Sequence, residues 1–125
     1  MKALLSHSAG KADTLQFGTL PDPVAGPAQV LIRIRACSLN FPDALMIEDL
    51  YQFKPERPFA PGNEVSGTIE AVGEGVDGLK VGDRVCALCG HGGLAELVAV
   101  DAWRCFAIPD EMPFDVASTI IMAYG

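Results

Sequence analysis

Short apolar segments that alternate with glycine- and proline-rich turns constrain the fold of this chain more than any other feature. The 125 residues include 13 glycines and 9 prolines. These two residues interrupt regular structure because glycine frees the backbone and proline removes its N–H group. Many short segments between such turns favour an all-β barrel over alternating strands and helices. The turn clusters lie at residues 21–23, 25–27, 73–82 and 90–93.

Period-two alternation identifies the strands, and the clearest case is the segment 29–40. Apolar residues occupy every second position from Val30 to Ala36, whereas Arg33 and Arg35 lie between them. We therefore predict a mainly β fold, a closed or partly open barrel with short helices. Five further runs have the β-branched or alternating character of strands, at residues 2–7, 64–72, 84–88, 94–100 and 104–108.

Two short helices are predicted at residues 42–50 and 113–122. Each begins with a proline followed closely by an aspartate, which suits the first turn of a helix. Asn40 stands just before the first helix, where its side chain can cap the free N–H groups. The second helix would be the segment by which the chain leaves the barrel.

Composition excludes several classes of protein. Half of the residues are hydrophobic, which excludes a disordered chain, and the length suits one domain. The net charge of −7, without a cluster of lysine or arginine, argues against a nucleic-acid partner. No apolar run reaches transmembrane length and residues 1–20 lack the form of a signal peptide, so we expect a cytoplasmic protein with no membrane partner. Free thiols are then expected at Cys37, Cys86, Cys89 and Cys105.

A Gly-x-Gly-x-x-Gly pattern at residues 73–78 follows a predicted strand, as the phosphate-binding motif of dinucleotide-binding folds does. The next residues, 79–83, cannot open a helix of useful length. Glu74 and Asp77 would also repel a phosphate. We expect a tight turn here and no nucleotide.

The spacing Cys86-x-x-Cys89-x-His91, with Cys105 further along, is similar to that of a zinc site. However, the odd separation of the first two cysteines along a strand places them on opposite faces. Cys105 lies inside a different predicted strand. A structural metal or a redox pair is therefore disfavoured, and ordinary buried thiols are expected.

The run from Pro58 to Gly67, with the glycine-rich stretch 68–85 behind it, resembles the signature region of the medium-chain dehydrogenase/reductase superfamily in its GroES-like catalytic domain. Zinc-dependent alcohol dehydrogenases of that superfamily carry Gly-His-Glu in this region, and the histidine binds the metal. This chain has Gly62-Asn63-Glu64 instead. It also lacks the four-cysteine lobe that the zinc-binding relatives insert.

The second zinc-binding position of those relatives is also changed in this chain. Their strand ends in Ala-x-Gly-Val-Cys-x-x-Asp, and Asn40 of this chain falls on the position of the metal-binding cysteine. Strand parity places Cys37 on the face of Arg33 and Arg35. Neutral amide oxygens are poor ligands for zinc, and the two histidines lie outside these motifs. No catalytic zinc is expected.

The chain instead resembles the zinc-independent quinone oxidoreductase branch. The Asn-Phe-x-Asp hallmark stands at residues 40–43, and Tyr51 follows it. A glycine often precedes or adjoins that tyrosine in the branch, whereas residues 48–50 of this chain are Glu-Asp-Leu. The remaining matching segments are 54–64, 92–96 and 124–125.

The resemblance implies hydride transfer from NADPH to a quinone or an α,β-unsaturated carbonyl compound. Negative charge then develops on oxygen, and without a metal it must be stabilised by hydrogen-bond donors. Tyr51 and Asn40 are the predicted catalytic donors, and Asn40 and Phe41 are predicted to contact the cofactor. Tyr51 could instead pack a loop, and Asn40 could cap a helix as well. Glu64 and Asp43 are expected to have structural roles.

We interpret residues 1–125 as a catalytic domain truncated before a Rossmann cofactor domain, because the apolar segment 117–125 stops abruptly. The isolated chain is then expected to bind NADPH weakly or not at all and to be inactive. Residues 120–122 are expected to promote self-association or to remain disordered, and a homo-oligomer is expected. The alternatives are a zinc-type alcohol dehydrogenase, an enoyl thioester reductase and a stand-alone GroES-like binding module.

Overall fold

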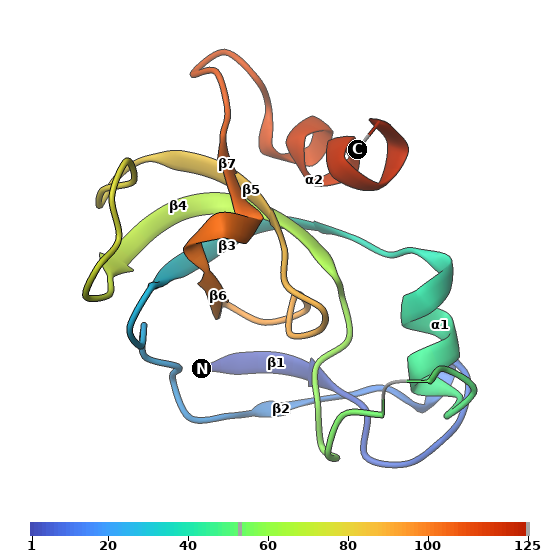
Figure 1. Ribbon diagram of the computed structural model, residues 1–125. Helices are drawn as coiled ribbons and strands as arrows, with labels where there is room; N and C mark the ends of the chain where they lie inside the picture. The colour runs from blue at the N-terminus through green and yellow to red at the C-terminus, as the bar shows by residue number, and fades with distance from the viewer. Residues whose placement is uncertain (53, 125) are drawn as a thin grey trace.

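The computed structural model describes residues 1–52 and 54–124, with side-chain surroundings through Thr119. Within this part of the chain, two antiparallel sheets and two α-helices form the fold (Figure 1). The larger sheet has the strand order β6-β3-β4-β5-β7, and the smaller sheet pairs β1 with β2. The elements are β1 (Lys2–Leu5), β2 (Gln16–Thr19), β3 (Gln29–Ser38), α1 (Phe41–Ile47), β4 (Glu64–Val72), β5 (Arg84–Leu88), β6 (Leu97–Asp101), β7 (Cys105–Ala107) and α2 (Phe114–Tyr124).

The expected mainly β fold with a partly open barrel is confirmed, since the two sheets remain open. Strands β4 and β5 match the predicted segments to the residue, and β6 and β7 are shorter than predicted. Strand β2 was not predicted, because three of its four residues are exposed and leave no apolar alternation to read.

Strand β3 lies in the middle of the large sheet, between β4 and β6. Val30 and Ile32 are completely buried on it, as the alternation predicted. They belong to a core cluster that draws on five strands of this sheet. The other buried members are Val65, Ile69, Val85, Ala87, Val98, Val100 and Cys105.

The parity prediction for Cys37 is wrong. The register of β3 against β4 shifts between Ile34 and Ala36, where β3 carries one extra residue. Such a bulge reverses the alternation beyond it. Cys37 therefore packs against the large core cluster, whereas Arg35 is exposed.

The β1–β2 hairpin forms a smaller core of its own and is tied to the rest of the fold by two isolated bridges. Ala3, Leu5 and Ala60 are buried together there. The bridges join Ser6 with Phe59 and Ala3 with Ala95. The hairpin thus lies across the open side of the large sheet, at the bottom of Figure 1.

Helix α2 packs on β3, β4 and β5, and α1 lies at the side of the fold beyond the end of β3 (Figure 1). Both helices were predicted from the sequence, although α1 ends at Ile47, three residues early. Asp49 follows with a φ of 65°, which cannot continue a right-handed helix. Arg84 holds the segment before α2, because its guanidinium donates to the carbonyl of Met112 at 2.7 Å. The same guanidinium lies 4.2 Å from the ring centroid of Phe114, the first residue of α2. The predicted behaviour of residues 120–122 depends on side-chain surroundings that lie outside the described part of the structure.

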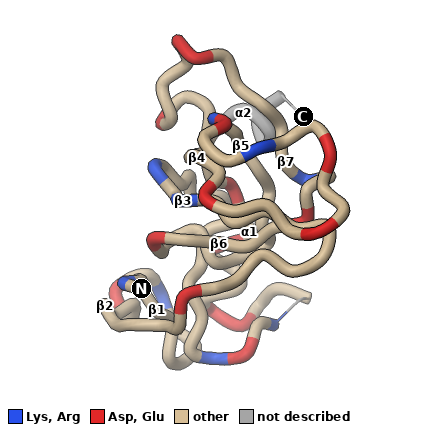
Figure 2. Tube along the Cα trace, turned by 90° about the vertical axis from the view of Figure 1, so that its left-hand side faces the viewer, with Lys and Arg blue, Asp and Glu red and all other residues tan. Residues whose placement is uncertain are grey.

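The glycine-rich residues 73–82 form turns that lead directly into strand β5 and not into a helix. The expected tight turn is therefore confirmed. The described cysteines are all free thiols, also as expected. Figure 2 shows lysine and arginine positions scattered among the more numerous acidic ones along the described trace. Neither helix in this part of the chain is long and apolar enough to cross a membrane.

Candidate active site

Asn40 is held at the junction between β3 and α1. Its backbone is extended, with φ −126° and ψ 170°, and it is the N-cap residue of α1. Its N–H group donates to Oδ2 of Asp43 at 2.7 Å, which is one half of a capping box. Asn40 therefore takes the predicted N-cap position, and the bond to Asp43 fixes its backbone.

The carboxamide of Asn40 faces a buried carboxylate. Glu64, the first residue of β4, is 0% exposed and pairs with Ser38 across the sheet. The Asn40 amide nitrogen lies 3.4 Å from Oε1 of Glu64 and 3.5 Å from the Ser38 hydroxyl. The same hydroxyl lies 2.9 Å from Oε1 of Glu64. The expected structural role of Glu64 follows from these contacts, which orient the side chain of Asn40.

Asp43 is the least satisfied polar group of the site. Its side chain is 1% exposed, and its Oδ1 has no hydrogen-bond partner among the described residues. Burial raises the pKa of Asp43, and the nearby charge of Glu64 raises it further, while the backbone amides of Asn40, Gly62 and Asn63 act in the opposite direction. Asp43 begins the helix as predicted, but its burial was not predicted.

Asn63 uses its carboxamide to hold a loop. Its Oδ1 accepts a hydrogen bond from the N–H of Gly90 at 2.9 Å, and its backbone carbonyl accepts from the N–H of Cys89 at 2.7 Å. Both donors belong to the loop between β5 and β6. A conformational role of this kind could not be read from the sequence, which only showed that the residue is not histidine.

The side chains at the two zinc-ligand positions, Asn40 and Asn63, do not fit a catalytic zinc ion. Asn40 and Asn63 offer neutral amide oxygens, and the oxygen of Asn63 is already bonded to backbone. Burial, together with the charge of Asp43, raises the pKa of the nearby Cys37 to about 12, which keeps the thiol protonated, whereas zinc binds thiolate. Among the described residues no cluster of three histidine, cysteine or carboxylate side chains could hold a metal. The motif formed by Cys86, Cys89, His91 and Cys105 is therefore not such a cluster.

Leu39 and Phe41, on either side of Asn40, are 58% and 75% exposed. They make the surface around the carboxamide apolar and partly aromatic. Tyr51 is half-buried and follows α1, so the helix separates it along the chain from Asn40. In the described structure no hydrogen bond joins the two residues. The structure therefore brings Asn40, Asp43 and Glu64 together, and the catalytic and cofactor roles of Tyr51, Asn40 and Phe41 stay predictions.

Comparison with known proteins agrees with this fold. Residues 26–110 match the family model of the alcohol dehydrogenase GroES-like domain. The chain belongs to this family. It is 37% identical over 126 residues to the human synaptic vesicle membrane protein VAT-1 homolog, an alignment that covers 99% of the chain and 32% of that relative.

Two further relatives bear on chemistry. The quinone oxidoreductase-like protein 2 homolog of Nematostella vectensis is 40% identical over 101 residues, which are 80% of this chain and 28% of that protein. A mycobacterial protein solved in complex with NADPH superposes with a TM-score of 0.89 at 32% identity, covering 98% of this chain and 38% of that one. The chain is thus similar to part of a quinone oxidoreductase-like protein, and it spans about a third of the length of the curated relatives it matches.

Proposed function

We propose that this chain is the catalytic domain of a zinc-independent reductase that transfers hydride from NADPH to a quinone or an α,β-unsaturated carbonyl compound. The observation that supports this most is the fixed carboxamide of Asn40. Glu64 and Ser38 hold it from the protein side, and exposed apolar residues flank it on the outer side. An oriented amide at the surface of a domain is suited to bind a second polar, planar group.

NADPH is proposed because the mycobacterial relative was solved with it. When bound, NADPH would supply the hydride. In this chain we assign Asn40 and Phe41 to contact it, since the amide offers both a donor and an acceptor and the neighbouring ring is 75% exposed. Most of the cofactor contacts would come from a Rossmann domain outside residues 1–125.

The proposed chemical task of this domain is to stabilise oxygen as it gains negative charge. Donors that are already oriented lose little free energy to reorganisation when the charge develops. The Asn40 amide is proposed as one such donor, through an N–H that does not serve Glu64 or Ser38, because its contacts with these two residues restrict its rotation. The hydroxyl of Tyr51 is proposed as the second donor, and this role rests on the family resemblance alone.

The proposal is tested on the complete product of the gene that encodes this chain. NADPH oxidation is followed with benzoquinone and with an enoyl thioester, and the reduction of NADP⁺ is followed with a primary alcohol. Turnover with benzoquinone that survives exhaustive dialysis against a chelator is the expected result. Activity that is lost to the chelator and restored by zinc would instead identify a zinc-type enzyme. The 125-residue chain alone is expected to be inactive.

Two substitutions separate the proposed role of Asn40 from its role as a helix cap. Asn40→Ser keeps a good cap but removes the amide, whereas Asn40→Ala removes both. Both variants are expected to lose about 100-fold in kcat/KM. Only the alanine variant should lose about 1 kcal/mol of stability. Full turnover by Asn40→Ser would refute the proposed role of the amide.

A further inference from the structure

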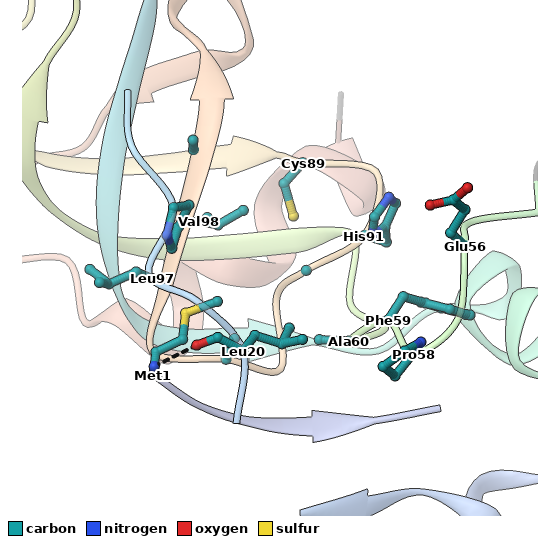
Figure 3. Close-up of a pocket in the computed structure, with 14 residues that line it drawn as sticks. Met1, Leu20, Glu56, Pro58, Phe59, Ala60, Cys89, His91, Leu97 and Val98 are labelled. Atoms are coloured by element: carbon teal, nitrogen blue, oxygen red, sulfur yellow. Dashed lines mark hydrogen bonds between the residues drawn. The ribbon is translucent and has the colours of Figure 1, made fainter. Parts of the chain in front are cut away.

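A pocket of about 410 Å³ lies between the β1–β2 hairpin and strand β6 (Figure 3). It is found where the two core clusters face each other. Val98 on its wall belongs to the large cluster, while Ala60 belongs to the small one and Leu20 packs against it. Asn40 and Glu64 are not among the lining residues, so this pocket is separate from the candidate active site.

The pocket exists because small residues line the gap between the sheets. Ala60, Gly92, Ala95 and Ala99 all contribute to its wall. The interior of a small barrel is either filled by side chains or left wide enough for one small ligand. A volume of about 410 Å³ lies within the range of about 300–1,000 Å³ found for small-molecule sites.

Among the described lining residues, none on the inner wall carries a free charge. Phe59 is 4% exposed and its ring meets the imidazole of His91 edge-on, with 5.8 Å between centroids and an angle of 77°. Burial lowers the pKa of His91, so its imidazole is neutral at pH 7. Burial likewise raises the pKa of the Cys89 thiol to about 12, and its Sγ lies 3.3 Å from the carbonyl oxygens of both Gly62 and Asn63, either of which can accept the thiol proton.

Charged groups are confined to the two ends of the pocket. Glu56 is exposed and lies beside His91 at one end (Figure 3). At the other end the amino group of Met1 donates to the carbonyl of Leu20 at 2.7 Å and pairs with Asp22 at 2.9 Å. An ion placed in the interior would lose its hydration without gaining a partner, which is strongly unfavourable.

We infer that this pocket is a second binding site, for a small uncharged molecule built on a single ring, whose apolar body lies against Phe59, Leu97 and Val98 and whose hydroxyl or carbonyl group lies toward His91. Edge-to-face contact with Phe59 would add to the burial of the ring. A neutral imidazole has one donor nitrogen and one acceptor nitrogen, and a ligand hydroxyl, which can both donate and accept, can bond to either of them. This inference does not depend on the proposed reductase activity.

The test is a titration of the isotope-labelled 125-residue chain with phenol, followed by nuclear magnetic resonance. Saturable shifts are expected at the amides of Phe59, Gly92 and Leu97, which line the pocket. Benzoate, which has the same ring and a negative charge, should give no saturable shift at these amides. Equal binding of benzoate, or phenol shifts that do not saturate or that scatter over the surface, would overturn the inference.

Substitutions that fill the pocket test the site, and the same substitution outside the pocket serves as the matched control. Ala95→Leu and Ala99→Leu each place a larger side chain on the wall, from different parts of the chain, and should weaken phenol binding about tenfold or more. Ala71→Leu makes the same change on β4, outside the pocket, and should leave it unchanged. His91→Phe, which keeps the ring, should remove any preference for phenol over toluene. Unchanged phenol binding in both filled variants, or a preference that survives in His91→Phe, would contradict the site.

Discussion

The hydroxyl of Ser38 at the end of β3 lies 2.7 Å from the carbonyl oxygen of Ser118 in α2 and 2.9 Å from Oε1 of Glu64. A serine hydroxyl carries one proton, so it can donate to only one of these two acceptors at a time. The candidate site and the C-terminal helix are therefore joined through a single side chain, two residues before Asn40.

Ser38→Ala should destabilise the fold by about 1–3 kcal/mol, because it leaves buried acceptors on Glu64 and Ser118 without this donor. Urea unfolding measures the loss, and amide exchange in α2 should accelerate. Ser8→Ala removes an exposed hydroxyl and should change the free energy of unfolding by less than about 0.5 kcal/mol. If the two variants are equally stable, the hydroxyl does not hold the helix.

Asp43 should make stability depend on pH. Burial raises its pKa in the folded state, so between the ordinary value near about 4 and the raised value the folded chain binds more protons than the unfolded one. The contribution of this group is therefore greatest in acid and falls as the pH rises through that window. Asp43→Asn, which cannot ionise, should lose less stability between pH 4 and 7 than the parent chain.

Denaturant titrations at several pH values give the comparison. The exposed Asp13→Asn serves as the control for a general change in charge. Parallel curves for the parent and Asp43→Asn would show that the buried carboxyl does not titrate in this range.

Features that depend on the local sequence could be predicted, whereas features that depend on the pairing of distant segments could not. Strands β4 and β5 were predicted to the residue because alternating apolar positions are bounded by glycine-rich turns. The orientation of Cys37 could not be predicted from the sequence, because the bulge that reverses it arises only when β3 pairs with β4. The cap at Asn40 has a local signal, whereas its contact with Glu64 joins residues 24 positions apart.

The same difference holds for the side chains of the candidate site: local roles could be predicted and tertiary contacts could not. Asp43 was predicted to begin a helix, and the capping bond confirms it, but its burial depends on how residues 62–63 pass beside α1. The bond from Gly90 to Asn63 depends on the placement of the β5–β6 loop. The position of Tyr51 relative to a substrate has no local signal, since the residue follows the helix in an irregular segment.

The thiols of Cys37, Cys89 and Cys105 should be almost inert in the folded chain. Burial raises each pKa to about 12, and the thiolate is the form that reacts. At pH 8, alkylation by iodoacetamide should be slower than in urea by on the order of a hundredfold or more, as judged by mass spectrometry of each cysteine. Rapid labelling of any of the three without unfolding would show that its thiol is ionised or exposed.

Gly67→Ala should cost about 3 kcal/mol or more, because β4 passes β3 too closely for a side chain there. An added Cβ would lie 2.0 Å from the carbonyl oxygen of Arg33 and 3.0 Å from a methyl group of Ile32, and the first of these is backbone that cannot turn away. Gly75→Ala is the matched control. Its Cβ would meet nothing within 4 Å, and its φ of 83° alone should cost about 1–2 kcal/mol. Urea unfolding of the two variants separates crowding from backbone conformation, and equal losses would mean that β3 moves aside at Gly67.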